Sequence, residues 1–376
     1  MLIFFLFLCL SPFSRIVSAS AHHLSLGFNP AGLPDKGDGA FLESMAFGGS
    51  SAMPYLSIIS DQWDGPFSPK NTNNLDSLWR VETGLIHHGW RLACFYRGEL
   101  FLEANRDTVD ILRKINLKQT LPAGKRYDID LRSTGFSASG IELSKGMVLR
   151  DIHDGLAMGF TVRYLRGEKI QDGRIEGIVI PSDSKSYDLN LFIDYVYDEN
   201  FIYEREKTRP GTGHGFSLDF GLTWVIGQNF SGQLLLRDLG GRIYWKDVPY
   251  TTANASSEVK VYDPDGYQEY RPSIKGYEGY KDYVQSIPLK IDVAFSYHRG
   301  PFTLTPAASC FENRQLIWIN LDYQAIGAFA LRAGYNFNYQ ALSLGLSYRK
   351  CSFDIYGTKP DVNRTNVLGL SLSLGY

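Results

Sequence analysis

The last ten residues of the chain alternate strictly between two kinds of side chain. Leu368, Leu370, Leu372, Leu374 and Tyr376 occupy every second position, and glycine or serine lies between them. Successive side chains of a β-strand point to opposite faces, so the segment predicts one apolar face that ends in an aromatic ring and one small, polar face. A strand of about ten residues with this pattern fits a bilayer span, apolar toward lipid and polar toward a lumen.

The same two-residue period recurs along most of the chain. Several of these segments end in an aromatic ring, as at Trp224, Tyr297, Tyr335 and Tyr348, which is typical of interfacial girdles. A soluble antiparallel sheet also alternates, but its apolar face needs a covering layer, and only residues 108–117 have a short helical pattern. We therefore predict an all-β fold, a transmembrane antiparallel β-barrel of about 12–14 strands. The clearest segments are 127–132, 156–164, 187–197, 216–226, 289–298, 329–338 and 342–349.

Composition narrows the choice of protein class. The 38 basic and 40 acidic residues nearly cancel, which argues against nucleic-acid binding. The 23 Tyr, 23 Phe and 37 Gly suit many strands joined by tight turns, although a β-sandwich or a secreted β-solenoid shares part of this signature. No run of 18 apolar residues occurs beyond the N-terminus, which excludes helical membrane spans.

The N-terminus predicts a secretory signal peptide, residues 1–21. Residues 2–10 form an apolar core, and Ala19-Ser20-Ala21 fits a cleavage site, with cleavage expected after Ala21 and after Ala19 as the alternative. No Lys or Arg precedes the core, so either the true start lies upstream or the signal is atypical. The cysteines left after its removal, Cys94, Cys310 and Cys351, lie on outward strand phases, and we favour lipid-facing hydrophobes over a disulfide or metal site.

Three long connections are expected, at residues 105–125, 198–213 and 247–285. The last is rich in tyrosine, which fits ligand binding and packing between loops equally well. The strand phase slips between Tyr348 and Cys351, where either a bulge or a turn would account for the change.

One motif resembles a known family. Asn29, Pro30, Ala31, Gly32 and Leu33, close behind the signal peptide, resemble the hatch motif of FadL-type outer-membrane transporters, whose superfamily includes PorV-like and TraF-like barrel proteins. Residues 215–222 and 234–241 are similar to paired strands of the PorV-like branch, and the terminal strand is similar too.

The resemblance implies a fold and two functions. It implies an N-terminal hatch or plug at residues 22–76 and a barrel at residues 77–376, in the bacterial outer membrane of a Gram-negative envelope. The favoured function is that of a passive uptake channel for small hydrophobic, fatty-acid-like molecules, which would leave sideways through an opening in the wall. The alternative is a non-transport scaffold or shuttle in a surface secretion or conjugation system.

Charged side chains on the inward phase are mixed in sign. A selective pore would favour one sign, so the mixture favours a packed or plugged lumen held by ion pairs over a polar channel. The predicted lumen-facing residues are Asp128, Asp130, Arg132, Arg163, Asp188, Asp194, Asp219, Arg237, Lys290, Asp292, Asp322, Arg332 and Arg349.

No enzyme, cofactor or metal is expected. His214 and Ser217 lie near each other in sequence, but Ser217 is on the lumen phase, so a surface hydrolase is only a minor alternative. Adjacent strand residues point to opposite faces, so the pairs His22–His23 and His87–His88 are not expected to share a metal. Residues 263–266 predict a turn, with a lone Ca²⁺ site as a weaker alternative.

The predicted partners follow from this fold. They are outer-membrane lipid, a hydrophobic small-molecule ligand, and the barrel-assembly machinery during insertion, with no nucleic acid. The residues expected to act as the C-terminal insertion signal are Leu370, Leu372, Leu374 and Tyr376.

Overall fold

The computed structural model describes residues 28–149, 155–182, 187–198, 211–257, 260–262, 268–270, 273–325 and 327–375. The predicted signal peptide, the pair His22–His23, the 263–266 turn and Tyr376 lie outside these residues.

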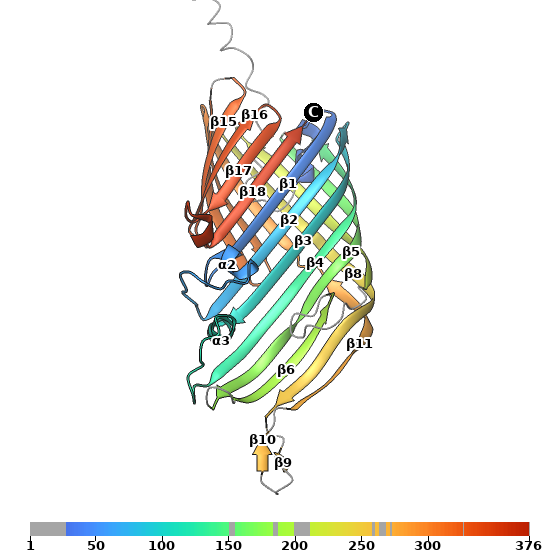
Figure 1. The fold of residues 1–376 in the computed structure, drawn as a ribbon. Helices are drawn as coiled ribbons and strands as arrows, with labels where there is room; N and C mark the ends of the chain where they lie inside the picture. The colour runs from blue at the N-terminus through green and yellow to red at the C-terminus, as the bar shows by residue number, and fades with distance from the viewer. Residues whose placement is uncertain are drawn as a thin grey trace, which may run out of the picture.

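Antiparallel strands form one curved wall that closes on itself (Figure 1). The first strand pairs with the last, from Phe41 opposite Gly375 to Gly49 opposite Val367. The described residues thus form a closed antiparallel barrel with 14 strand positions, as the periodicity predicts. The strands are β1 (Gly39–Ser50), β2 (Thr72–His87), β3 (Trp90–Asn105), β4 (Tyr127–Val148), β5 (Leu156–Pro181), β6 (Tyr187–Tyr197), β7 (Thr212–Ile226), β8 (Phe230–Ser256), β11 (Ser273–Ser286), β12 (Lys290–Arg299), β13 (Phe302–Phe311), β14 (Arg314–Gln324), β15 (Phe329–Asn336), β16 (Ala341–Tyr348), β17 (Cys351–Gly357) and β18 (Val367–Gly375).

Two of the strand positions are each shared by two strands in line. β7 pairs with the first half of β5 and β6 with its second half, so β6 and β7 together fill the place between β5 and β8. In the same way, β12 and β11 follow each other along β8. The short strands β9 (Lys260–Tyr262) and β10 (Gln268–Tyr270) form a separate two-stranded sheet.

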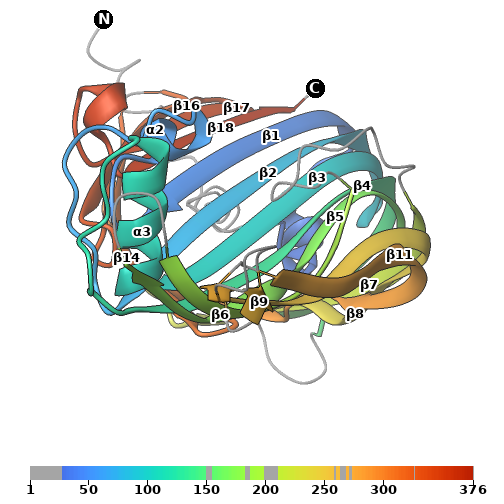
Figure 2. The ribbon, with the colours of Figure 1, turned by 60° about the horizontal axis from the view of Figure 1, so that its bottom comes forward.

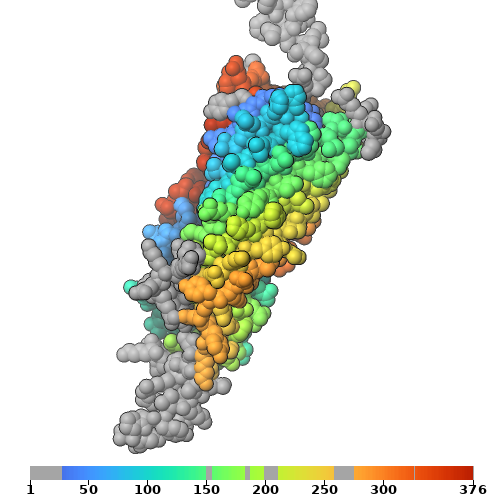
Figure 3. Space-filling view, turned by 90° about the vertical axis from the view of Figure 1, so that its right-hand side faces the viewer, coloured from blue at the N-terminus to red at the C-terminus, as the bar shows by residue number. Residues whose placement is uncertain are grey.

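The two ends of the barrel differ. At one end the strands are joined by short turns such as Arg349–Lys350, whereas the connections at the other end include α2 (Tyr55–Ile59), α3 (Arg106–Asn116) and η2 (Val362–Arg364). Figure 2 looks toward this long-loop end, where α3 lies along one side of the mouth. Here one side of the wall, which we name the extension, projects past the blue and cyan strands (Figure 3). The extension comprises residues 127–137 of β4, 169–181 of β5, β6, residues 242–256 of β8, and β11.

Several sequence-based boundaries change. The predicted hatch, residues 22–76, is wrong in its C-terminal part, because β1 and the first residues of β2 pair within the wall. Most of the predicted loop 247–285 is strand, because β8 continues to Ser256 and β11 begins at Ser273. The phase slip before Cys351 is a turn, since Tyr348 pairs with Cys351 across Arg349 and Lys350. The helix predicted at 108–117 is confirmed as α3.

The outer face of the wall is apolar and bounded by aromatic rings. Leu85, Val162 and Leu344 are among the many large aliphatic side chains exposed there. Near the short turns, rings of neighbouring strands pack in pairs, with centroids 4.4–5.0 Å apart in Phe230–Tyr297, Phe302–Tyr323 and Phe329–Tyr348. Tyr96, Tyr164 and Tyr244 are exposed toward the other end. Such a belt between two girdles is what contact with a bilayer requires.

Two further observations concern the same surface. Cys94, Cys310 and Cys351 are free and exposed. Among the described residues, no helix combines the length and apolarity needed to span a bilayer.

Candidate functional site

The predicted hatch motif lies inside the barrel near the short-turn end. Asn29 begins the helix η1 (Pro30–Asp35), because its Oδ1 accepts a hydrogen bond of 3.0 Å from the backbone N–H of Ala31, and Pro30 needs no such partner. Ala31 and Leu33 are fully buried. The segment therefore lies within the lumen against β4, β5 and β7, and we call it the plug; it is much shorter than the hatch predicted at residues 22–76.

Three glycines of the wall make room for this plug. A β-carbon at Gly146 or Gly159 would overlap the backbone of Pro30, and one at Gly221 would overlap the side chain of Asn29. These inward positions on β4, β5 and β7 form a seat without side chains. The plug can approach the wall this closely because glycine occupies the three wall positions that face it.

A network of buried ion pairs crosses the lumen next to the plug. Arg80 donates to Glu142 at 2.8 Å, and Arg91 donates to Glu82 at 2.5 Å and pairs with Glu142. Arg163 bridges Glu142 at 2.8 Å and Asp219 at 2.6 Å. Strands β2, β3, β4, β5 and β7 are thereby joined through their inner faces.

The network continues around the barrel to β8 and β12. Asp238 accepts from Arg97 at 2.9 Å and from Lys290 at 3.0 Å, and Lys290 also pairs with Glu99 at 2.8 Å. Arg237 pairs with Asp292 at 2.7 Å. At the edge of the network, the half-buried Glu43 also pairs with Arg91 at 3.6 Å. Among the described residues, the buried part of the network holds six basic and six acidic side chains, so it is electrically balanced. Its members are Arg80, Arg91, Arg97, Arg163, Arg237, Lys290, Glu82, Glu99, Glu142, Asp219, Asp238 and Asp292, all at most 8% exposed.

The predicted lumen-facing residues meet different fates. Arg163, Asp219, Arg237, Lys290 and Asp292 belong to the network, and a separate inner pair joins Arg332 to Asp354 at 3.0 Å, with Asp322 at 3.6 Å. Others share the inward phase but lie in the extension, where they are exposed or half-buried: Asp128, Asp130, Arg132, Asp188 and Asp194. The prediction that Arg349 faces the lumen is wrong, since this residue lies exposed in the β16–β17 turn.

Sequence reasoning missed seven members of the network. Charges two residues apart, as at Arg80 and Glu82 or at Arg97 and Glu99, share one face of a strand and were a usable signal. Their segments were not among the clear alternations, in part because Thr83 and Gly98 occupy positions between apolar residues on the outward phase. The missed residues are Arg80, Glu82, Arg91, Arg97, Glu99, Glu142 and Asp238.

A second feature is an apolar cavity of about 480 Å³ at the base of the extension, here called the wall pocket. Its floor consists of small residues on the outward phase of β4 and β5, and its sides come from larger apolar residues of β2, β3, β4, β5 and β6. It begins just past the level of Tyr96, the ring at the edge of the apolar belt. The floor includes Ser133, Gly135, Ser137 and Gly173, and the sides include Trp79, Leu100, Leu102, Leu131, Ile175 and Tyr195.

Local irregularities shape this pocket. Ser137 pairs with Lys169 and Ala138 with Gly167, so Glu168 is an extra residue that forms a bulge and bends the wall. The indole of Trp79 occupies the space over Gly98 that a β-carbon would fill. Two polar atoms of the lining, Ser137 Oγ and Gln171 Oε1, are buried with no hydrogen-bond partner among the described residues.

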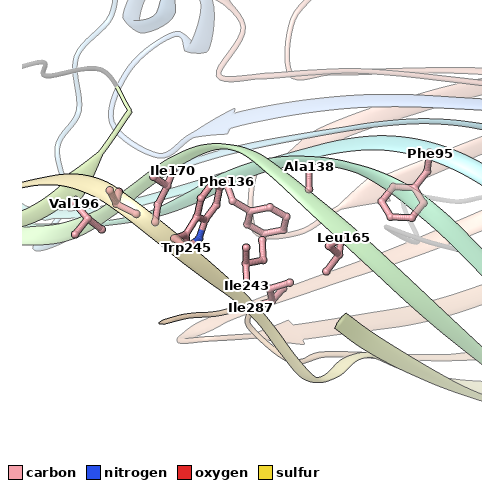
Figure 4. Close-up of a cluster of buried hydrophobic side chains, with 10 residues drawn as sticks. Phe95, Phe136, Ala138, Leu165, Ile170, Val196, Ile243, Trp245 and Ile287 are labelled. Atoms are coloured by element: carbon pink, nitrogen blue, oxygen red, sulfur yellow. The ribbon is translucent and has the colours of Figure 1, made fainter. Parts of the chain in front are cut away.

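The inner face behind the pocket is tightly packed (Figure 4). Phe136 and Ile170 line the pocket and also belong to a buried cluster with Ile243 and Trp245. Gln285 of β11 accepts from the Trp245 indole at 3.1 Å and donates to the Gly135 carbonyl at 2.9 Å, so β11 reaches across to β4. A single packed layer therefore lies between the pocket and the inside of the barrel.

The His214–Ser217 pair is not brought together. Ser217 is buried on the inner face, while His214 is exposed and its ring contacts the Tyr164 hydroxyl at 2.5 Å. The geometry gives no support for a hydrolase built on these two residues.

Together, the closed wall and the apolar belt define a transmembrane β-barrel, and η1 lies inside it. The chain belongs to the family of unknown function DUF5723, whose profile matches residues 69–376. A comparison with curated protein sequences found no significant match.

The chain is also similar to several solved structures. One is a deletion mutant of the TodX monoaromatic hydrocarbon channel, at 9% identity, 93% and 92% coverage of the two chains, and a TM-score of 0.48. Another is a FadL homologue of Pseudomonas aeruginosa, at 11% identity, 93% and 92% coverage, and a TM-score of 0.43. A third is the Ralstonia pickettii toluene transporter TbuX, at 7% identity, 93% and 92% coverage, and a TM-score of 0.36.

Proposed function

We propose that this protein is a bacterial outer-membrane barrel that captures small hydrophobic molecules in the wall pocket as the first step of passive uptake. The observation that carries the proposal is the pocket itself. Its volume of about 480 Å³ lies within the range of small-molecule sites, and the surface it exposes is mainly apolar, although Glu99, Lys169, Arg174 and Asp198 also line it.

The position of the pocket supports capture. It lies beside the aromatic rim of the apolar belt, so a hydrophobic solute reaches it from water or from the edge of the lipid layer. The two unpartnered atoms, Ser137 Oγ and Gln171 Oε1, suit a ligand that carries one hydroxyl or amine group on an apolar body.

A second candidate, a non-transport scaffold, is favoured by a different observation. The ion-pair network and the plug occupy part of the lumen of the described barrel, and the network joins strands from β2 to β12. Passage through the centre would require the plug and several buried ion pairs to move. A scaffold needs no such movement.

A binding experiment in lipid nanodiscs tests the proposal. The Ser133→Phe variant places a ring on the pocket floor, and the matched control Leu143→Phe places a ring on the lipid-facing side of the same strand. We expect a fluorescent naphthylamine to bind the wild type and the control equally, and the Ser133→Phe variant at least about tenfold more weakly, a change of about 1.4 kcal/mol.

Uptake distinguishes the two candidates. In proteoliposomes, the proposal predicts entry of the fluorophore with wild-type protein and slower entry with Ser133→Phe. Equal binding by all three proteins, together with no entry above that of empty vesicles, would contradict capture and favour the scaffold. Retained heat-modifiable mobility in gels confirms that each variant folds.

A further inference from the structure

Three side chains with metal-binding atoms meet at the short-turn end of the barrel. Asp38 lies between the plug helix η1 and β1, His87 ends β2, and His88 follows in the β2–β3 turn. One ligand atom from each residue lies within 4.8 Å of the other two. All three residues are exposed, so solvent ions have access to them.

The turn explains why adjacent histidines converge. Alternation along a strand predicts opposite directions for His87 and His88, but His88 has left the strand and adopts a φ of +49°. Its ring consequently lies beside that of His87, with centroids 4.0 Å apart. A shared metal at His87 and His88 was not expected because adjacent strand residues point to opposite faces. That reason does not apply here, since His88 lies in a turn.

The spacing of the three atoms suits one small cation. Asp38 Oδ2 is 2.8 Å from His87 Nδ1 and 3.5 Å from His88 Nδ1. Tetrahedral Zn²⁺ with bonds of about 2.0–2.1 Å holds its ligand atoms roughly 3.3 Å apart. A cation could thus bind all three atoms after small side-chain rotations.

Backbone contacts hold the ligands near this arrangement. Asp38 Oδ1 accepts the backbone N–H of His88 at 2.9 Å, which leaves Oδ2 facing the imidazoles. Lys145 Nζ donates to the His88 carbonyl at 3.0 Å and fixes the turn from β4. These contacts reduce the conformational entropy that the ligand side chains and the turn lose when a metal binds.

We propose that Asp38, His87 and His88 form a binding site for a divalent transition metal of the zinc class, with a fourth position open to water. Two imidazoles and one carboxylate are a donor set that such metals prefer. Asp38 lies in the segment that joins η1 to β1, and the histidines lie at the end of β2 and in the turn that follows. The bound metal therefore crosslinks the segment after the plug to the β2–β3 turn.

Zinc titration of the full mature protein in detergent tests the site. His22 and His23 are replaced by alanine in every sample, so that these two additional histidines contribute no zinc ligands to the measurement. We expect one Zn²⁺ per chain by calorimetry, and at least about tenfold weaker binding in each of His87→Ala, His88→Ala and Asp38→Asn. The matched control, His214→Ala, removes an exposed histidine elsewhere and should bind as the parent does.

A second measurement reports the tie between plug and wall. Zinc should raise the thermal midpoint of the parent and the His214→Ala control, and at the same zinc concentration should raise that of His88→Ala less, because the stabilisation depends on how tightly the folded state binds the metal. Absence of zinc binding in the parent, or equal affinity in the parent and all three ligand variants, would overturn the proposal.

Discussion

The half of the barrel near the short turns and the extension at the long-loop end belong to the same wall. The side chains on their inner faces differ in kind. In the first, the inner face carries twelve buried charges around Arg163, and the outer face carries exposed aliphatic chains such as Val162. In the extension, the inner face carries a buried apolar cluster around Ile170 and Trp245, its charged residues are exposed or half-buried, and the outer face holds the wall pocket. The continuous strands β5 and β8 connect the two regions.

The surroundings of each half account for this difference. Where the outside is apolar, an inner face of paired charges gives the strand two unlike sides and so fixes its phase, since a one-residue slip would expose charges to lipid. Where the outside is water, burial of apolar side chains inside stabilises the sheet directly. The two regions should therefore respond differently to loss of their inner side chains.

The largest expected effect is that of Arg163→Ala. This change leaves the buried Glu142 and Asp219 without their shared partner, and removal of one member of a buried ion pair costs about 3–5 kcal/mol. We expect the thermal midpoint of the whole barrel to fall in heat-modifiability gels. Arg349→Ala, in an exposed turn, is the matched control, with an expected change within about 0.5 kcal/mol.

A smaller and more local effect is expected for Ile170→Ala. The cavity it leaves in the extension costs about 2–5 kcal/mol, but the extension lies outside the apolar belt and can open without the rest of the wall. We expect faster proteolysis within the extension and a nearly unchanged thermal midpoint for the barrel. Val162→Ala, on the lipid-facing side of the same strand, is the control. Loss of the whole barrel at lower temperature would show that the two regions unfold as one.

The smallest expected effect concerns α3, at the mouth beside the extension. Partial burial acts to raise the pKa of Asp110, but hydrogen bonds from Lys114 at 2.8 Å and Lys125 at 3.0 Å outweigh it and lower that pKa. The ion pairs therefore stabilise α3 above the ordinary pKa of an aspartate and are lost as the pH falls through the lowered value. Exposed pairs of this kind contribute about 0.2–1 kcal/mol.

Hydrogen exchange compared at equal pH measures this contribution. At pH 6, α3 should exchange faster in Asp110→Asn than in the wild type. The difference should shrink toward pH 3, where the carboxyl is increasingly protonated in the wild type. A difference that persists unchanged at low pH would assign the effect to packing rather than to charge.

Much of the wall was predictable because alternation survives wherever one face meets lipid. The segment ending in Tyr376 and those around Val162 and Leu344 were recognisable for this reason. The extension was less predictable. Gly276 and Gly279 interrupt the alternation of β11, and its high tyrosine content led to the prediction of a loop. The plug motif was recognisable from Asn29–Leu33, but its glycine seat at Gly146, Gly159 and Gly221 depends on pairing between distant strands.

The sites were harder to predict than the wall. The wall pocket arises from a bulge at Glu168 and from small residues on neighbouring strands, which become neighbours only through register. The convergence of His87 and His88 depends on one turn residue with positive φ. Neither feature is encoded in the two-residue period that predicts the fold.

The length of β8 has a consequence for how the molecule sits in an envelope. Its 27 residues span about 90 Å along the strand, whereas about 9–11 tilted residues suffice to cross the hydrocarbon layer. More than half of this strand must lie in water or among polar headgroups. Antibodies or chemical labels directed at the distal part of β8 would therefore reach it without disturbing the lipid.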